Sequence, residues 1–542
     1  ILGGALSTEL IGECMKSIQQ IFACAALVGS MFCGAPAHAA RDFTPQAGTW
    51  VVSSELDGKP GRGLAIDVQG NTFFMQVFAY DDKGVPTFYS AIGTMEGGAV
   101  TAPLVRYAGG RSFGSEPRSA GFDSSPGNVV VRFGDGLHGV VQFPGEPELA
   151  IERFLVKDAA FEDRFVKAST VAPRSMRLAG VDGGGITAVA WNAHLISGPA
   201  GNRQLVLQQV TGIAAAAAQT LDCTRRQTDD AYDCVASAAV AGGDIRVQKA
   251  SLRLVGGDVQ GVMDISGAVA GRLLVTGDVV MGGTVSVAGA CSQGAYTYVQ
   301  DIGCYSGDVQ IPSNGTWMVA NEIDGKPGRG IAIDVQHGWA IAQVFNYSGI
   351  GRSTFHMGSD AYGMQETTLT LNRYEGGRAI GGAPASAMLL DSAGEMYLGF
   401  YQQDDKTKRG TRVSGVVQFP RERFAPIVRL ALEPQDTITD RMAGQWLLRF
   451  QASQGGAGTV SRLVHLNQDR GGAIVSDDGE VQCAPVQSIA VSSEVLCIWK
   501  ADGGKGAVLG SAQFVQQANN RSSVAMRIRD SHGNLTGLGA WE

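Results

Sequence analysis

Residues 48–69 read GTWVVSSELDGKPGRGLAIDVQ, and residues 315–336 read GTWMVANEIDGKPGRGIAIDVQ. The two stretches are identical at 17 of 22 positions and lie at a constant offset of 267 residues. Arg106-Tyr107 and Arg373-Tyr374 match at the same offset, so the similarity continues well beyond the quoted stretch. A repeat of this length indicates that the chain contains two copies of one structural module.

The pattern inside the repeat is that of β-strands. Leu64, Ile66 and Val68 fall on one face of residues 63–69, whereas Asp67 falls on the other, which is the period of a strand. Gly70-Asn71 then forms a two-residue turn into a second alternating run that ends at Tyr80. Six further short runs lie at residues 48–55, 86–95, 100–107, 128–133, 137–143 and 149–155. Eight short strands with tight turns predict an antiparallel barrel or a sandwich.

The repeat also sets the expected domain organisation. The chain is predicted to be all-β, with tandem antiparallel barrel or sandwich modules in an A–B–A–B order. The stretch after each A module carries a closely spaced cysteine pair, which favours a duplicated A–B unit. The expected segments are a leader at 1–39, module A1 at 43–157, module B1 at 170–290, a linker with a local disulfide at 291–310, module A2 at 311–432 and module B2 at 436–542.

Composition supports a folded, turn-rich protein and argues against one class of partner. Glycine accounts for 75 of the 542 residues, and charged residues make up only 17%. A length of 542 residues is too great for one ordinary domain. The formal net charge of -8 argues against a nucleic-acid binder, which would carry a basic face.

The first 39 residues have the pattern of a secretory signal peptide. Met15-Lys16 begins a weakly basic segment, residues 21–32 are apolar, and Ala37-His38-Ala39 resembles a cleavage site. The apolar run is too short to span a membrane as a helix, so no membrane span is expected after cleavage. The predicted location is therefore secreted, periplasmic or at the cell surface.

Cysteine usage agrees with export. Six cysteines lie beyond residue 39, and they fall into three pairs of near neighbours in the sequence. An even number in an exported chain predicts disulfides, although six cysteines allow fifteen connectivities. Proximity in the sequence favours Cys223–Cys234, Cys291–Cys304 and Cys483–Cys497.

The A module resembles a repeat of an uncharacterised family of secreted bacterial β proteins. The shared elements are Trp50, a Gly-x-Gly turn at 61–63, the VQG of 68–70, Tyr80-Asp81 and the PTFY of 86–89. The second copy departs from this pattern, because His356 replaces Tyr89 and Ser348 replaces Asp81. The resemblance covers A1 and A2 only, and it implies export and β structure rather than an activity.

Two sets of residues are candidates for ligand binding in each A module. In the glycine-rich loop, Lys59 and Arg62, with Lys326 and Arg329 in the second copy, could bind an anion such as an acidic sugar. Alternatively, the loop is a β-turn with solvated cations. A mixed polar and aromatic strand face could bind a sugar or peptide, or could instead pack against a neighbouring module. This face comprises Asp67, Gln76, Phe78 and Tyr80 in A1 and Asp334, Gln343, Phe345 and Tyr347 in A2.

Signatures of catalysis are mostly absent from the sequence. It contains no HExxH and no EF-hand loop, and its histidines are scattered. We therefore expect no catalytic residues, no metal and no cofactor, and regard a hydrolase as unlikely. The leading interpretation is a secreted, non-enzymatic protein that binds a glycan, a peptide or an envelope component. The alternatives are a lipocalin-like carrier of a small apolar ligand and a purely structural envelope subunit.

Overall fold

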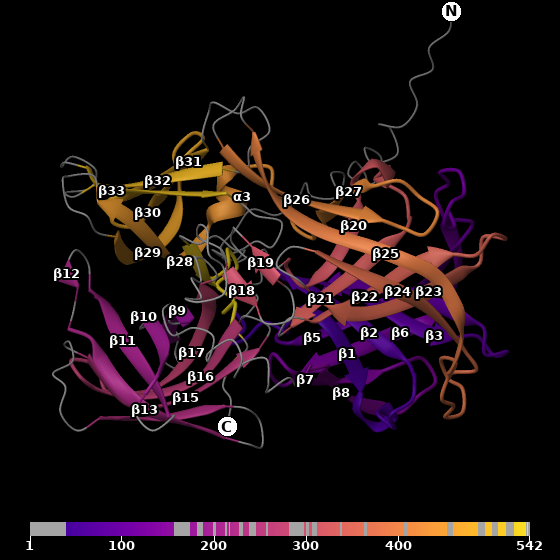
Figure 1. Cartoon of the computed structure of the whole chain (residues 1–542), viewed down its shortest axis with the longest axis horizontal. Coiled ribbons are helices and arrows are strands. Elements are labelled where there is room, and N and C mark those ends of the chain that lie inside the picture. Colours follow the sequence, from indigo (N-terminus) through magenta and orange to yellow (C-terminus); the bar gives the residue numbers. More distant parts are fainter. Residues whose placement is uncertain are drawn as a thin grey trace, which may run out of the picture. The chain divides into compact units, whose positions relative to one another are not determined.

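The computed structural model describes residues 40–542 with gaps. The stretches outside the description are 157–173, 182–187, 199–201, 212–213, 216, 227–230, 238–244, 256–257, 281–296, 300–302, 306–311, 337–338, 363–365, 406–409, 453–458, 486–493, 501–507, 516–524, 538 and 540–542. The described chain consists of antiparallel strands with one short α-helix, α3 (Ile438–Met442), which confirms the all-β prediction (Figure 1). No helix in this part of the chain has the length and apolar character needed to cross a membrane. The predicted leader lies outside the described residues.

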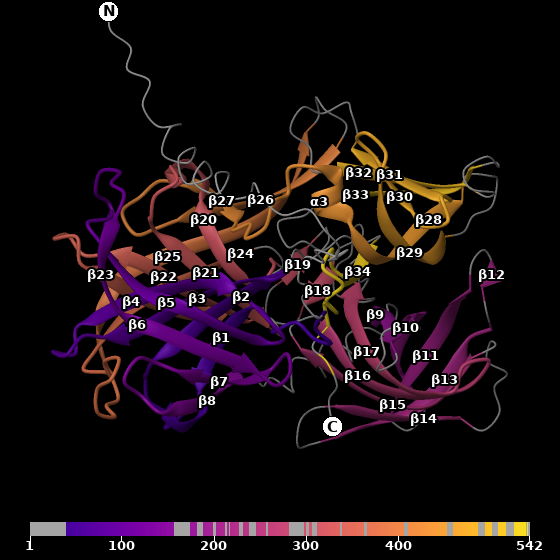
Figure 2. The same cartoon turned by 180° about the vertical axis from the view of Figure 1, so that it is seen from behind.

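Module A1 is a closed eight-stranded barrel. Each strand pairs with the next, and β8 pairs back with β1, which decides between the two predicted architectures (Figure 2). The eight predicted runs all form strands, although β1 ends early because a 3-10 helix occupies Ser53–Glu55. The strands are β1 (Gly48–Val52), β2 (Gly63–Gln69), β3 (Thr72–Tyr80), β4 (Pro86–Thr94), β5 (Ala99–Ala108), β6 (Gly121–Phe133), β7 (His138–Gln142) and β8 (Glu148–Arg153).

Module A2 repeats this barrel in the same order and register. Trp50 lies opposite Leu64 in A1, and Trp317 lies opposite Ile331 in A2. The extra residues of the second copy lengthen one hairpin, β25–β26. The strands are β20 (Gly315–Val319), β21 (Gly330–Gln336), β22 (Trp339–Tyr347), β23 (Ser353–Ala361), β24 (Glu366–Glu375), β25 (Met388–Asp405), β26 (Gly410–Gln418) and β27 (Ala425–Arg429).

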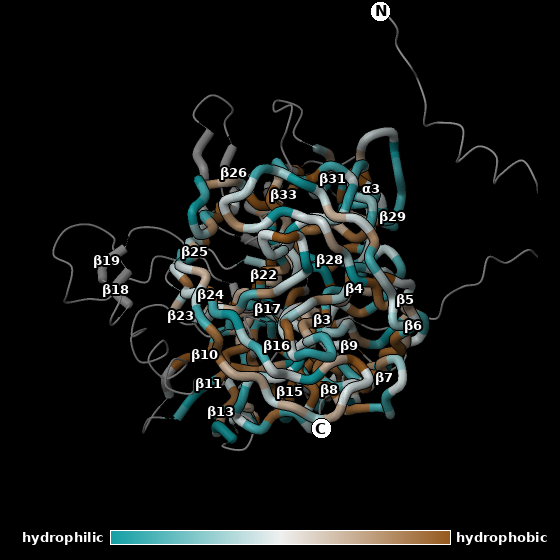
Figure 3. Tube along the Cα trace, turned by 90° about the vertical axis from the view of Figure 1, so that its right-hand side faces the viewer, coloured by the Kyte–Doolittle hydropathy of each residue, from teal (hydrophilic) through white to brown (hydrophobic). Residues whose placement is uncertain are grey.

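The inward faces of both barrels form their hydrophobic cores. Hydrophobic and hydrophilic positions alternate along many strands, as expected for a sheet with two different faces (Figure 3). Trp50, Leu64 and Phe73 are completely buried inside A1, and Trp317 and Ile331 are completely buried inside A2. A cavity large enough for a ligand would give the side chains that line it accessible surface, and these five residues have none. Apolar side chains therefore fill the parts of the barrels that these residues line.

The B modules are also antiparallel sheets. In B1 the two ends of the sheet meet, because β10 pairs with both β9 and β11. In B2, β28, which is the last strand but one of its sheet, likewise pairs with β29 at the opposite end. The B1 strands are β9 (Arg174–Val181), β10 (Ala188–Ser197), β11 (Arg203–Thr211), β12 (Ala214–Ala215), β13 (Gln219–Arg225), β14 (Tyr232–Ala236), β15 (Ile245–Val255), β16 (Asp258–Gly267) and β17 (Gly271–Val280). A small hairpin, β18 (Thr297–Val299) and β19 (Gly303–Tyr305), follows. The B2 strands are β28 (Gly444–Ala452), β29 (Thr459–Asp469), β30 (Ile474–Ser476), β31 (Val481–Pro485), β32 (Glu494–Lys500), β33 (Val508–Val515) and β34 (Ala525–Arg529).

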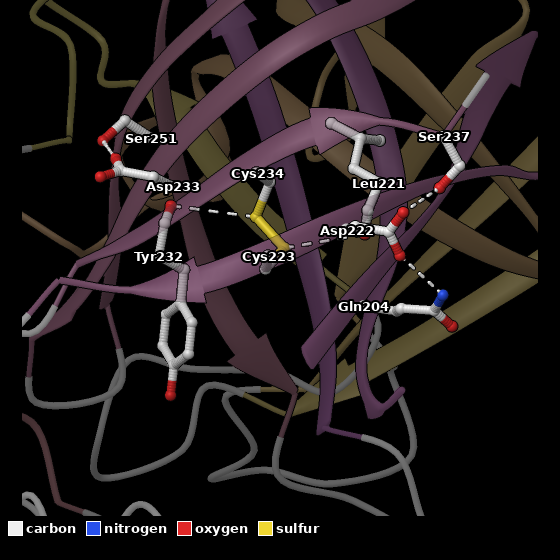
Figure 4. Close-up of a disulfide and its surroundings, with 9 residues drawn as sticks. All are labelled: Gln204, Leu221, Asp222, Cys223, Tyr232, Asp233, Cys234, Ser237 and Ser251. Atoms are coloured by element: carbon white, nitrogen blue, oxygen red, sulfur yellow. Dashed lines mark hydrogen bonds between the residues drawn. A yellow bond between two sulfur atoms is a disulfide. The ribbon is translucent and has the colours of Figure 1, made fainter. Parts of the chain in front are cut away.

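Each B module contains one cross-strand disulfide. Cys223 of β13 lies directly opposite Cys234 of β14, and their sulfurs are bonded (Figure 4). Cys483 and Cys497 form the same kind of bridge between β31 and β32. All four cysteines belong to the hydrophobic cores. Two predicted bridges are thus confirmed, whereas the third, Cys291–Cys304, involves Cys291, which lies outside the described residues.

Removing the first bridge should weaken B1. The double substitution Cys223→Ala/Cys234→Ala is expected to lower the free energy of unfolding of B1 by about 3 kcal/mol, because the bridge closes a short loop in the unfolded chain. Thermal unfolding with peptide-resolved hydrogen exchange would measure this loss in B1 alone. An unchanged B1 transition in the double variant would contradict the expectation.

Candidate functional site

The glycine-rich loops of the two A modules place their cations in opposite environments. Lys59 and Lys326 are exposed at the tips of the loops. Arg62 and Arg329 are buried, with 3% and 5% of their surface exposed. Only the lysines can therefore meet a partner in solution, although the sequence presented all four as candidate anion-binding groups.

Arg62 is enclosed by two carboxylates and an aromatic ring. Its guanidinium donates to Glu55 and to Glu146 at 2.6 Å each, and its Cζ lies 4.8 Å from the centre of the Phe143 ring. Burial alone would lower the pKa of Arg62, but the hydrogen bonds that it donates to both glutamates outweigh burial and raise the pKa. Arg378 of module A2 donates to Glu55 at 2.9 Å, so the cluster joins the two barrels.

Module A2 carries the same cluster with the roles of the barrels exchanged. Arg329 donates to Glu422 at 2.6 Å and also to Glu322, while Arg111 of A1 donates to Glu322 at 2.7 Å. Burial would raise the pKa of Glu422, but hydrogen bonds from Arg329 and a backbone amide of A1 hold it below its ordinary value. Each barrel thus supplies one arginine to the largely buried glutamates of the other.

The two arginines that cross between the barrels, Arg111 and Arg378, belong to two loops that each barrel extends over the other. The first arm, residues 109–120, connects β5 to β6, and the second arm, residues 376–387, connects β24 to β25. The first arm is held on A2 by backbone hydrogen bonds from Gly109 to Gly351 at 2.7 Å and from Ala120 to Pro327 at 2.8 Å. The equivalent bonds of the second arm join Gly376 to Gly84 at 2.8 Å and Ala387 to Pro60 at 2.7 Å.

Two equivalent ion pairs lie between the barrels, one with its arginine in A1 and the other with its arginine in A2. Arg153 of A1 binds both carboxylate oxygens of Asp334 in A2, at 2.6 and 2.7 Å, and both side chains are essentially inaccessible to water. Arg429 of A2 binds Asp67 of A1 in the same bidentate way, with one bond at 2.7 Å. The repeat begins with glycine for this reason: a side chain at Gly48 would collide with the Arg153 guanidinium, and its φ of 131° also disfavours other residues.

Polar side chains complete the contact around these ion pairs. The backbone amide of Thr49 donates to Asp334 at 2.9 Å, and the Thr49 hydroxyl accepts a bond of 2.7 Å from Gln343. In the other direction, Thr316 donates from its amide to Asp67 at 3.2 Å and from its hydroxyl to Gln76 at 3.3 Å. The polar members of the predicted binding face therefore bind the facing barrel.

The aromatic members of that face form a layer between the barrels. Phe78 and Phe345, which are equivalent in the two copies, lie 5.6 Å apart between ring centres. Tyr80 and Tyr347 are 1% exposed, and burial raises the pKa of both phenols. Their rings lie directly against Gly377 and Gly110 of the exchanged arms. The layer is formed by Phe78, Tyr80, Phe88, Phe345, Tyr347 and Phe355.

The predicted site residues thus divide into an exposed and a buried group. Lys59 and Lys326 remain exposed, and the other candidates lie in the inter-barrel interface, which is the alternative that the sequence left open for the strand face. Sequence reasoning missed the partners Arg153, Arg429 and the two arms. A signal existed for the arginines, because IERF at 151–154 and IVRL at 427–430 place them at equivalent points of the two copies.

Chemically, the interface is a closed contact in which charges neutralise each other. The buried arginines and carboxylates described above bind one another, so none of these charged groups is left without an ionic partner. Within the described residues, no group of three or more His, Cys, Asp and Glu is placed to hold a metal ion. No family model, curated protein or solved structure matches this chain.

Proposed function

We propose that this chain is an exported, non-enzymatic protein whose paired A barrels form a rigid frame that presents two copies of one loop to an acidic partner. The observation that carries the proposal is that both glycine-rich loops are held in a fixed position and expose a lysine. Each tip keeps an exposed lysine, Lys59 or Lys326, while the arm of the opposite barrel holds the loop in place.

The clamping of each loop involves side chains as well as backbone. Asp57 accepts a bond of 2.9 Å from the amide of Lys59 and a bond of 2.7 Å from the hydroxyl of Ser386 in the second arm. Asp324 accepts from the amide of Lys326 at 2.9 Å and from Ser119 of the first arm. A loop that is fixed before binding loses less conformational entropy when a partner binds.

The surface chemistry of the loops suggests the class of partner. An exposed apolar residue lies three positions before each lysine: Leu56 and Ile323 are both 51% exposed. A cation beside an apolar side chain suits an acidic polysaccharide or an acidic peptide segment. A single lysine binds such a partner weakly, but two fixed copies gain apparent affinity against a partner with repeated charges.

The burial of particular residues bears on the two alternatives, a small-ligand carrier and a structural subunit. The filled cores around Trp50 and Trp317 weigh against a carrier of a small ligand in the barrel lumen. Burial of the Asp67 and Asp334 faces favours the second candidate, a purely structural envelope subunit. Export rests on the leader pattern, on the resemblance to secreted proteins, and on the two disulfides, which form in oxidising compartments.

Substitution of both loop lysines tests the proposal. With immobilised polygalacturonate as the probe and dextran as the neutral control, Lys59→Ala/Lys326→Ala should lower the apparent affinity by about 100-fold. Either single variant should fall to the affinity of one site. Lys83→Ala, which removes an exposed lysine of another A1 turn, is the matched control and should bind normally. Binding that survives the double substitution would contradict the loop assignment, and failure to bind any acidic polysaccharide or peptide would favour the structural alternative.

A further inference from the structure

Each exchanged arm inserts one apolar residue against the core of the opposite barrel. Phe113 of the first arm packs against the core of A2, and Ile380 of the second arm packs against the core of A1. The Phe113 ring lies 5.3 Å from the ring of Phe419, between ring centres. The arms therefore act as plugs, and the two plugs differ in what lies beneath them.

A buried histidine lies beneath the first plug. The His356 ring is 4.8 Å from the Phe113 ring, and only 5% of the residue is exposed. Its Nδ1 atom has no hydrogen-bond partner among the described residues. A neutral imidazole tolerates this environment, whereas an imidazolium would be a charge buried under an aromatic ring without a bonded anion.

The charged groups around His356 oppose a second positive charge. Arg373 of β24 is a cation facing the histidine, and Asp391 of β25 is already bound to that arginine, with one bond of 2.6 Å. The arm itself contributes Arg111, whose glutamate partners Glu322 and Glu422 also bind Arg329. Burial first, and Arg373 second, lower the pKa of His356 to about 4, against a smaller opposing effect of Asp391.

The A1 residue equivalent to His356 cannot acquire a positive charge. Tyr89 lies opposite Val77 in the β3–β4 pair, as His356 lies opposite Val344 in β22–β23. Burial raises the pKa of Tyr89, with Arg106 as a smaller opposing influence, so this phenol stays neutral in acid. The two arms are therefore matched in their ion pairs, whereas the plug residue and the buried residue at the His356 position differ between them.

We propose that the first arm is an acid-released plug: protonation of His356 expels Phe113 and frees residues 109–120 from A2, while the second arm stays in place. The closed arm is fully stable above the ordinary histidine pKa of about 6.5. Its stability falls as the pH drops toward about 4, because the open state binds the proton more tightly than the closed state does. This switch does not depend on what the exposed loops bind.

The test compares the two arms within one full-length chain. Hydrogen exchange read by mass spectrometry at pH 7 and pH 4, corrected for intrinsic exchange rates, gives an opening constant for each arm. The amides of Gly109 and Ala120 bond to A2 and report release of the first arm. Its opening constant should rise about 100-fold between pH 7 and pH 4. This factor follows because the pKa of His356 is about 6.5 in the open arm and about 4 in the closed arm. The second arm should rise far less.

Exchange of the two buried residues provides matched variants. His356→Tyr should make the first arm as acid-resistant as the second, and Tyr89→His should make the second arm acid-labile. His356→Gln, which is smaller and neutral, replaces His356→Tyr if the tyrosine variant fails to fold. Equal loosening of both arms in the unmodified chain, or undiminished acid release in the His356 variants, would overturn the proposal, because general acid weakening of the matched ion pairs would then explain the data.

Discussion

Replacement of Arg153 by alanine is expected to lower the free energy of unfolding by about 3–5 kcal/mol, because the Asp334 carboxylate would remain buried without its partner. Arg429→Ala, which removes the equivalent bond to Asp67, should cost a similar amount. Urea denaturation followed by tryptophan fluorescence would measure both losses. The double variant Arg153→Ala/Asp334→Ala should be less destabilised than the sum of the single variants, because no charge is then left unpaired.

A surface ion pair of the same barrel provides the control. Arg132 and Glu148 form an ion pair in which the side chains are 49% and 44% exposed. Arg132→Ala should therefore change the free energy of unfolding by no more than about 1 kcal/mol. If Arg153→Ala is as mild as Arg132→Ala, the inter-barrel ion pair does not hold the barrels together.

Phe78→Ala is expected to destabilise the chain by about 3–5 kcal/mol, because it removes a fully buried ring from the aromatic layer. Phe345→Ala, at the equivalent position of A2, should have a similar effect. Phe122→Ala is the matched control, since its ring is 70% exposed and should contribute almost nothing. Denaturation midpoints for the three variants decide the matter, and equal midpoints for Phe78→Ala and Phe122→Ala would count against a packed layer.

The distribution of similarity between the two copies has a physical explanation in this interface. In a two-fold contact between like surfaces, each residue plays the same part on both sides. The stretches 48–69 and 315–336 contain Gly48, Arg62 and Asp67 with their counterparts, all of which lie at the inter-barrel contact or in the ion-pair clusters that cross it. A change on one side alone would leave a buried charge unpaired, so the interface keeps the two copies alike.

The strands were predictable because local patterning determines them. Alternation at 63–69 and the Gly70-Asn71 turn fix β2, β3 and their register without reference to the rest of the chain. Strand β6 began earlier than predicted, at Gly121 rather than residue 128, since GFDSSPG has no apolar periodicity and is held by pairing to β5. The choice of barrel over sandwich depended on β1 pairing with β8, about a hundred residues away.

The use of the polar face could not be predicted from its own residues. Asp67 beside Phe78 and Tyr80 suits a ligand and a protein surface equally well, and the deciding partner, Arg429, lies 362 residues later. Arg62 looked available because Glu146, 84 residues further on, does not follow from any local pattern. In the sequence the two arms look like ordinary loops that contain glycine and serine. Their conformation is fixed by hydrogen bonds to the opposite barrel.

The most direct test of the paired barrels is a cysteine cross-link between β4 and β23. The hydroxyl oxygens of Thr87 and Ser353 lie 2.7 Å apart, and both residues are buried. Cysteines at these two positions would place their sulfurs within reach of a disulfide. In the full-length double variant Thr87→Cys/Ser353→Cys, mass spectrometry of the monomer should find a peptide that links residues 87 and 353 in nearly every molecule. A monomer that remains uncross-linked under oxidising conditions, or cross-links that form only between chains, would contradict the paired-barrel structure.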